Sequence, residues 1–182
     1  MSLPPQLSLA QSGLSGGSSG FSPSAEETLV VIGLSDRLAA LRAESVERIV
    51  LNAALVQPPG LPLLLEGILN LAGTAIPVLR LDRLLNLPDQ HIGLYSMILI
   101  LRCGCAILVD HVFRVTTISG NSVLPIAASD CFNACAEFTA QIDGEAVPLL
   151  STERILLEKE KRVLSEFRET EQLRFDRWEG RA

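Results

Sequence analysis

Short apolar runs rich in aliphatic and β-branched residues recur along most of the chain. Turn-forming residues such as Gly, Asp, Asn and Pro separate them, which is a pattern typical of β-strands. The runs that we expect to form strands are 28–34, 38–41, 67–71, 75–79, 96–102, 106–109, 112–118, 137–142 and 147–150. About nine short strands at this spacing predict a mainly β protein, a barrel or a sandwich, rather than a parallel α/β sheet.

Turn and helix signals lie between these runs. Cys103-Gly104-Cys105 and Asp143-Gly144 each place Gly between two strands, so both are expected to be hairpin turns. In 44–50 the apolar residues fall at helical spacing and predict a short helix. Asp82 is expected to cap a helical turn that runs to Leu87. Two further segments are expected to be loops, 57–62 and 120–130.

The last part of the chain differs in kind, because no Gly or Pro occurs from Ser151, an N-cap candidate, to Trp178. Charges of both signs are interspersed, which predicts a helix about 40 Å long. Its apolar residues form a stripe that Glu171 interrupts. Two interpretations stay open. The first turns pack on the β domain while the end extends into solvent, or the helix docks or dimerises through Phe167, Phe175 and Trp178.

Composition narrows the classes of function. The chain has 182 residues with 48% hydrophobic residues, enough for one domain and its core, and 1–26 is a Ser/Gly-rich segment expected to be disordered. Aromatic residues make up 4% and the net charge is -6, so nucleic acid is not an expected partner. The N-terminus lacks signal-peptide features, and no apolar run reaches the length of a membrane span. We therefore expect a cytoplasmic protein without direct membrane insertion.

Few side chains are suited to catalysis. No dinucleotide-binding, P-loop or nucleophile-elbow motif is present. His91 lies in a polar segment, and His111 follows Asp110 on an expected strand, where adjacent side chains point to opposite faces. We therefore expect no enzymatic activity and no cofactor, and infer that the domain acts by binding.

The four cysteines are Cys103, Cys105, Cys131 and Cys135. In a reducing compartment they are expected to be thiols. Cys-x-Cys followed by Cys-x-x-x-Cys is not the repeated Cys-x-x-Cys of structural zinc sites, so no metal is expected. A thiol- or zinc-responsive regulator remains as an alternative of another functional class.

One block carries a specific motif: Leu65-Glu66-Gly67-Ile68-Leu69-Asn70-Leu71-Ala72-Gly73, followed by Ile76-Pro77-Val78 and Leu81. It resembles the signature of CheW-like chemotaxis coupling domains, which places Gly, Asn-Leu, Gly and Pro at set spacings. Val109-Asp110-x-Val112 and 149–156 are also similar to that family. The resemblance covers 27–157 and implies two intertwined five-stranded β-barrels with short helices, followed here by a helical extension over 158–182.

The resemblance also implies a function. CheW-like proteins are adaptors that bridge chemoreceptor cytoplasmic tips and the regulatory domain of a CheA-type histidine kinase in two-component signalling. A hydrophobic groove between the barrels receives the receptor helices, and Val46, Met97 and Val115 match positions that line it. This is helix-in-groove recognition, in which aliphatic and Met side chains fill a seam. For each residue alone, an ordinary core position is the competing interpretation.

The chain departs from the family pattern at charged positions. Ala72 replaces an arginine, Arg80 an aspartate, and Arg48 a glutamate ahead of Ile49, whereas the scaffold residues are kept. We therefore expect an altered and more positive partner-binding face. The residues expected to bind partners are Val46, Arg48, Ile49, Asn70, Ala72, Arg80, Met97 and Val115.

Overall fold

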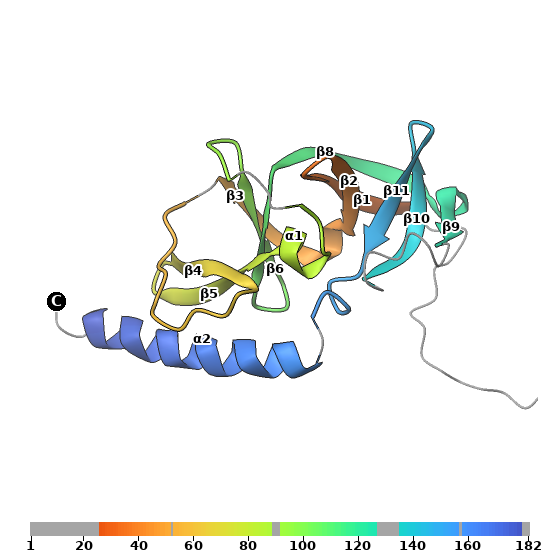
Figure 1. Ribbon diagram of the computed structural model, residues 1–182. Helices are drawn as coiled ribbons and strands as arrows, with labels where there is room; N and C mark the ends of the chain where they lie inside the picture. The colour runs from red at the N-terminus through yellow and green to blue at the C-terminus, as the bar shows by residue number, and fades with distance from the viewer. Residues whose placement is uncertain (1–25, 52, 89–91, 127–134, 157, 180–182) are drawn as a thin grey trace, which may run out of the picture.

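The computed structural model describes residues 26–51, 53–88, 92–126, 135–156 and 158–179, and the account below concerns these residues. The strands form two sheets, and a long C-terminal helix lies along the second (Figure 1). Residues 1–25 of the expected disordered tail, His91 and Cys131 lie outside the described residues, whereas Glu26, also expected in the tail, begins a strand. In chain order the elements are β1 (Glu26–Leu34), β2 (Arg37–Arg42), η1 (Ala43–Ser45), β3 (Val46–Leu51), β4 (Leu65–Leu71), β5 (Thr74–Arg80), α1 (Leu81–Leu84), β6 (Met97–Leu101), β7 (Ala106–Val109), β8 (His111–Ser119), η2 (Gly120–Ser122), β9 (Val123–Pro125), β10 (Ala136–Ile142), β11 (Glu145–Leu150) and α2 (Glu158–Glu179).

Both sheets mix antiparallel and parallel pairs. The first has six strands in the order β8-β1-β2-β11-β10-β9, and the second has five in the order β3-β6-β7-β5-β4. In the first sheet the parallel pair is β2 and β11, and in the second it is β5 and β7. Each parallel pair joins two hairpins that are separate in the sequence, so the sheets depend on contacts distant along the chain.

Three hydrophobic clusters hold the sheets. The central cluster lies between the two sheets and takes residues from both, among them Ile32 and Leu41 of the first and Leu99 and Ile107 of the second. Side chains alternate between the faces of a strand, so the opposite face of each sheet needs its own core. A second cluster is built from the first sheet alone and a third mainly from the second.

The nine predicted strand regions are all confirmed as strands, as are both hairpin turns. The helix predicted over 44–50 is wrong, because only Ala43–Ser45 forms a single 3-10 turn and Val46–Leu51 is strand β3. Its β-branched residues pair with β6, and this tertiary pairing outweighs the local helical spacing. The loop predicted over 120–130 also contains a short strand, β9, which pairs with β10.

Both predicted helix caps are wrong. Asp82 lies inside α1, whose N-cap residue is Arg80, and its side chain is buried in an ion pair. Ser151 precedes a turn, and α2 begins at Glu158. The mainly β fold with two sheets and a C-terminal helix is confirmed. Among the described strands no pairing joins the end strands of either sheet, so the closed five-stranded barrels stay a prediction.

Candidate docking surfaces

The end strand β3 exposes apolar side chains on the face that covers the central cluster. Ile49 pairs with Leu99, which is fully buried in that cluster, and Leu51 pairs with Met97. Directly opposed residues of an antiparallel pair share a face of the sheet. Ile49 and Leu51 therefore extend the apolar face of the second sheet outward, where they are 39% and 67% exposed.

The end strand β8 does the same for the first sheet. Val115 pairs with Val30, a buried member of the central cluster, yet Val115 itself is 56% exposed. Phe113 is skipped in the pairing of β8 with β1, since Val112 and Arg114 pair with consecutive residues, and it is also exposed. The core face of each sheet thus continues onto an end strand that nothing covers among the described residues.

We call these residues the edge surface. We include in it half-buried Val46 and Met97, both expected groove residues, which pack against the central cluster. Figure 1 shows β3 and β8 on the side of the molecule away from α2. Clustered exposed apolar side chains on a folded domain typically mark a protein interaction site. The members of the edge surface are Val46, Ile49, Leu51, Met97, Phe113 and Val115.

Arg48 does not belong to this surface. It pairs with Ile100, a member of the third cluster, so it lies on the opposite face of β3 from Ile49. Its side chain is exposed, as expected. The sequence grouped Arg48 with Ile49, and the strand separates them because adjacent side chains of a strand point to opposite faces.

Asn70 and Ala72 lie at the turn between β4 and β5, where both are exposed although the protein's own helix contacts the same turn. Ala72 and Gly73 both have positive φ, 49° and 85°, and the amide of Gly73 donates to Asn70 Oδ1 at 2.9 Å. Gln172 of α2 bonds the hairpin on both sides of Thr74. Its Nε2 donates to the Gly73 carbonyl and its Oε1 accepts from the Ala75 amide, each at 2.8 Å.

The described part of α2 packs on the domain well beyond its first turns. Leu164 is buried in the central cluster, and half-buried Phe167 packs against that cluster. Glu171, which interrupts the apolar stripe, is buried and paired with Arg174. Phe175 is half-buried, and the side chain of Trp178 lies outside the described ones. Phe167 therefore serves packing within the chain, and self-association through α2 stays a hypothesis.

Arg80 is not a surface residue, which corrects the expectation that it changes the charge of a partner face. Its side chain is 5% exposed, and that of Asp82 is fully buried. Arg80 Nε donates to Asp82 Oδ1 at 2.8 Å, Nη2 donates to the other oxygen of Asp82, and Nη1 donates to Glu66 Oε2 at 3.1 Å. These bonds to Asp82 and Glu66 raise the pKa of Arg80, although burial opposes them. The cation is neutralised inside the fold and ties β4, β5 and α1 together.

Candidate catalytic and metal-binding groups do not assemble in the described part of the chain. Asp110 accepts a bond from the Ser35 amide, while the His111 ring lies 5.9 Å from that of Phe113, so the two do not form a catalytic pair. No group of three His, Cys, Asp or Glu side chains there could hold a metal ion. Within the same residues, no helix is long and apolar enough to span a membrane.

Two mixed sheets with apolar end strands define a binding scaffold, and the comparisons assign it to a family. The CheW-like domain matches residues 28–160, so the chain belongs to the CheW-like family. It is similar to the scaffolding protein TtCheW from Thermoanaerobacter tengcongensis, with a TM-score of 0.65 and 26% identity over 70% of this chain and 90% of that one. A search of curated proteins gave no match. The family places the protein among the adaptors and scaffolds of chemotaxis signal transduction.

Proposed function

We propose that this protein is a non-enzymatic adaptor that couples chemoreceptor cytoplasmic tips to the regulatory domain of a CheA-type histidine kinase. Family membership and the likeness to a scaffolding protein support a coupling role. The observation that carries the proposal is the edge surface, where the core faces of both sheets continue into exposed aliphatic and aromatic side chains. The same family pattern supports our proposal that the two sheets, which have six and five strands and not five each as expected, curve into two barrels over 27–157.

The edge surface suits a helical partner. Val115, Ile49 and Leu51 are aliphatic, and Met97 beside them is an adaptable side chain that fills irregular gaps. An amphipathic helix that lays its apolar face on such a surface removes it from water, which is the driving force of helix-in-groove binding. We therefore assign the receptor tip to this surface.

Of the three positions where charge departs from the family pattern, Arg48 is the main one that changes the charge of an exposed face. Arg80 is paired internally, and the turn that holds Ala72 is bonded to α2. Because Arg48 lies on the other face of β3, we propose that it selects a second partner, the kinase regulatory domain, through an acidic patch. Arg48→Glu should then weaken kinase binding and leave receptor-tip binding unchanged, since charges at a rim act on steering and partner choice.

Binding measurements with matched variants test the assignment. Val115→Asp and Ile49→Asp each place a charge on the edge surface, whereas Leu63→Asp places one at an 88% exposed apolar residue elsewhere. We expect the first two to weaken binding of a receptor-tip fragment at least tenfold, which corresponds to about 1.4 kcal/mol. Melting midpoints should stay equal across the three variants. Equal affinities for Val115→Asp and Leu63→Asp would remove the edge surface from receptor binding.

A further inference from the structure

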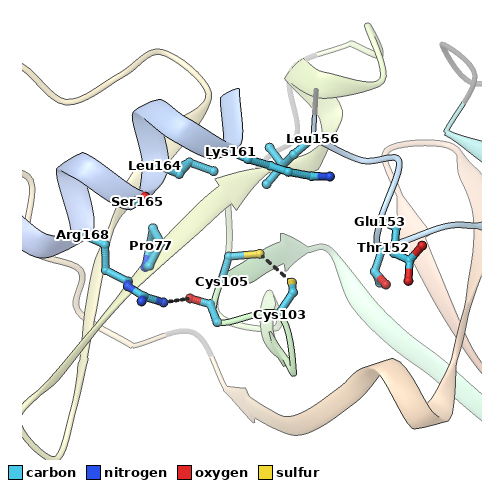
Figure 2. Close-up of a pocket in the computed structure, with 11 residues that line it drawn as sticks. Pro77, Cys103, Cys105, Thr152, Glu153, Leu156, Lys161, Leu164, Ser165 and Arg168 are labelled. Carbon is cyan, nitrogen blue, oxygen red and sulfur yellow. Dashed lines mark hydrogen bonds between the residues drawn. The ribbon is translucent and has the colours of Figure 1, made fainter. Parts of the chain in front are cut away.

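Cys103 and Cys105 flank the tip of the hairpin between β6 and β7. The turn is closed by a bond from the Leu101 amide to the Cys105 carbonyl at 2.8 Å, and Gly104 between the cysteines has a φ of 84°. This left-handed conformation is the one that Gly adopts without strain. The turn leaves Cys103 Sγ and Cys105 Sγ 3.3 Å apart, in direct contact (Figure 2).

The two thiols are in different environments. Cys103 is exposed, whereas Cys105 is 6% exposed and belongs to the central cluster. A hydrogen bond from the Cys105 thiol lowers the pKa of Cys103 to about 6 against the effect of burial, and the positive charge of Lys161 contributes in the same direction. The same bond, together with burial, raises the pKa of Cys105. These interactions favour the thiolate form of Cys103, with a protonated thiol beside it.

A cavity of about 370 Å³ opens over this pair, between the hairpin and α2. Figure 2 shows Cys103 and Cys105 on one wall and Lys161, Leu164 and Arg168 of α2 on another. Arg168 Nη1 donates to the Gly104 carbonyl at 3.4 Å. A Cβ on Gly104 would lie 2.6 Å from that nitrogen, so a larger residue there would displace the end of the Arg168 side chain.

The charges around the cavity favour a reactive thiolate. Lys161 and Arg168 face it from α2, and Glu153 is the acid among the lining residues. Reactive cysteines are typically exposed and next to cationic side chains. Cys103 meets both conditions, and a second sulfur lies within contact distance to complete a reaction.

We propose that Cys103 and Cys105 form a peroxide-responsive dithiol site, with Cys103 as the nucleophile and Cys105 as the resolving thiol. The Cys103 thiolate attacks one oxygen of hydrogen peroxide, the O–O bond breaks, and a sulfenic acid and hydroxide form. The sulfur of Cys105 then attacks that of Cys103, the S–S bond forms, and the sulfenic oxygen leaves as water with the Cys105 proton. Peroxide accepts two electrons and the two thiols supply them. Sulfenic acids condense readily with a neighbouring thiol.

The geometry suits the second step. A disulfide has an S–S length of about 2.05 Å, so the sulfurs at 3.3 Å need to approach by roughly one ångström, within reach of side-chain rotation. Closing the bond removes the negative charge of Cys103 that faces Lys161 and Arg168. Because Cys103 is exposed, a thiol reductant can reach the disulfide and reverse it, as in labile regulatory disulfides.

The size of the expected reactivity follows from the pKa. At pH 6 about half of Cys103 is thiolate, against about 0.3% of an ordinary cysteine with a pKa near 8.5. An acidic thiolate is intrinsically a weaker nucleophile, which offsets about a factor of ten. Alkylation of Cys103 at pH 6 should therefore be about tenfold faster than that of an ordinary exposed cysteine.

The experiment uses the reduced full chain and millimolar hydrogen peroxide, followed by alkylation and peptide mapping. The peptide that holds Cys103 and Cys105 should lose two hydrogens and recover them with dithiothreitol. Cys105→Ser, which keeps a hydrogen-bond donor beside Cys103, should accumulate a dimedone-reactive sulfenic acid on Cys103, and Cys103→Ser should not form the disulfide. The matched control Cys135→Ser should react like the wild type. An alkylation midpoint of Cys103 near pH 8.5, a pair that stays reduced in peroxide, or purified protein whose pair is masked by bound zinc would each overturn the proposal.

Discussion

The internal ion pair of Arg80 leads to the most decisive stability prediction. Arg80→Met keeps most of the side-chain volume but removes the guanidinium that donates to Asp82 and Glu66. Asp82, fully buried, would then keep a charge without its Arg80 partner inside the domain. The change therefore leaves a buried carboxylate without its guanidinium partner, which differs from the loss of a surface contact.

The expected magnitude follows from that burial. Removing one partner of a buried ion pair costs about 3–5 kcal/mol, because the remaining charge loses its compensation. A domain of ordinary stability has about 5–15 kcal/mol in total, so Arg80→Met should shift the unfolding midpoint far below that of the wild type. Replacing both groups, as Arg80→Met with Asp82→Leu, should recover most of the loss, since an apolar pair of similar volume is often as stable as the ion pair.

Urea denaturation of both single variants and the double variant measures this coupling as a double-mutant cycle. Arg83→Met is the control, because Arg83 is an exposed neighbour that donates to the Leu63 carbonyl, and it should cost about 0.5 kcal/mol or less. A cost below about 1 kcal/mol for Arg80→Met would match an exposed charge and refute the internal role. Weaker partner binding at unchanged stability would restore Arg80 to the partner face.

Three further predictions concern the packing of α2, the partly buried carboxylate of Glu137 and the N-terminal residues 1–25. Leu164→Ala should destabilise the domain by about 2–4 kcal/mol, whereas exposed Val163→Ala should have a much smaller effect, as measured by chemical unfolding. The pKa of Glu137 is lowered by its bonds to Arg42 and Ser151, although burial opposes them. Glu137 thus contributes to the free energy of unfolding above its unfolded pKa near 4.3, and this contribution is lost as pH falls through the lower folded pKa. In Glu137→Gln the free energy of unfolding should fall less steeply over this acid range, as measured by chemical unfolding at several pH values. Deleting residues 1–25 should leave the melting midpoint unchanged, because the segment offers little apolar surface to bury.

The strands could be predicted from the sequence because their signals are local. Each run of aliphatic residues is bounded by turn residues, and the motif of 65–73 fixes a tight β4–β5 hairpin through Asn70 and Gly73. The order of strands in each sheet depends on the parallel pairs, which no local pattern encodes. The sequence therefore predicted the β class and the family, but not the arrangement of the two sheets.

The candidate site was predicted in part. Val46, Met97 and Val115 were expected from the family resemblance and stay predictions as partner-binding residues, whereas the exposed residues Leu51 and Phe113 were missed. A helix over 44–50 would not place Ile49 and Leu51 on one face, whereas the alternation of side chains along strand β3 does. Arg80 was expected on the surface only because it replaces an acidic residue of the family pattern. The sequence does not show that Asp82 and Glu66 pair with it inside the fold.

The contact between α2 and the β4–β5 turn could not be predicted at all. No sequence pattern distinguishes Gln172 from the other polar residues of α2. Its two bonds to the hairpin join segments almost one hundred residues apart. Such a side-chain bond depends on the final docking of the helix and leaves no periodic signal in the sequence. It places α2 beside Ala72, which is itself exposed, so the partner-binding role of Ala72 stays a prediction.

The coupling role is tested most directly by reconstitution. Receptor cytoplasmic fragments and the CheA-type kinase of the same cell are mixed with this protein, and kinase autophosphorylation is measured with and without the receptor. We expect receptor-dependent control of the kinase with the wild type and its loss with Val115→Asp, while Leu63→Asp behaves as the wild type. Kinase activity that does not respond to this protein, in the presence of a receptor that binds it, would contradict the account.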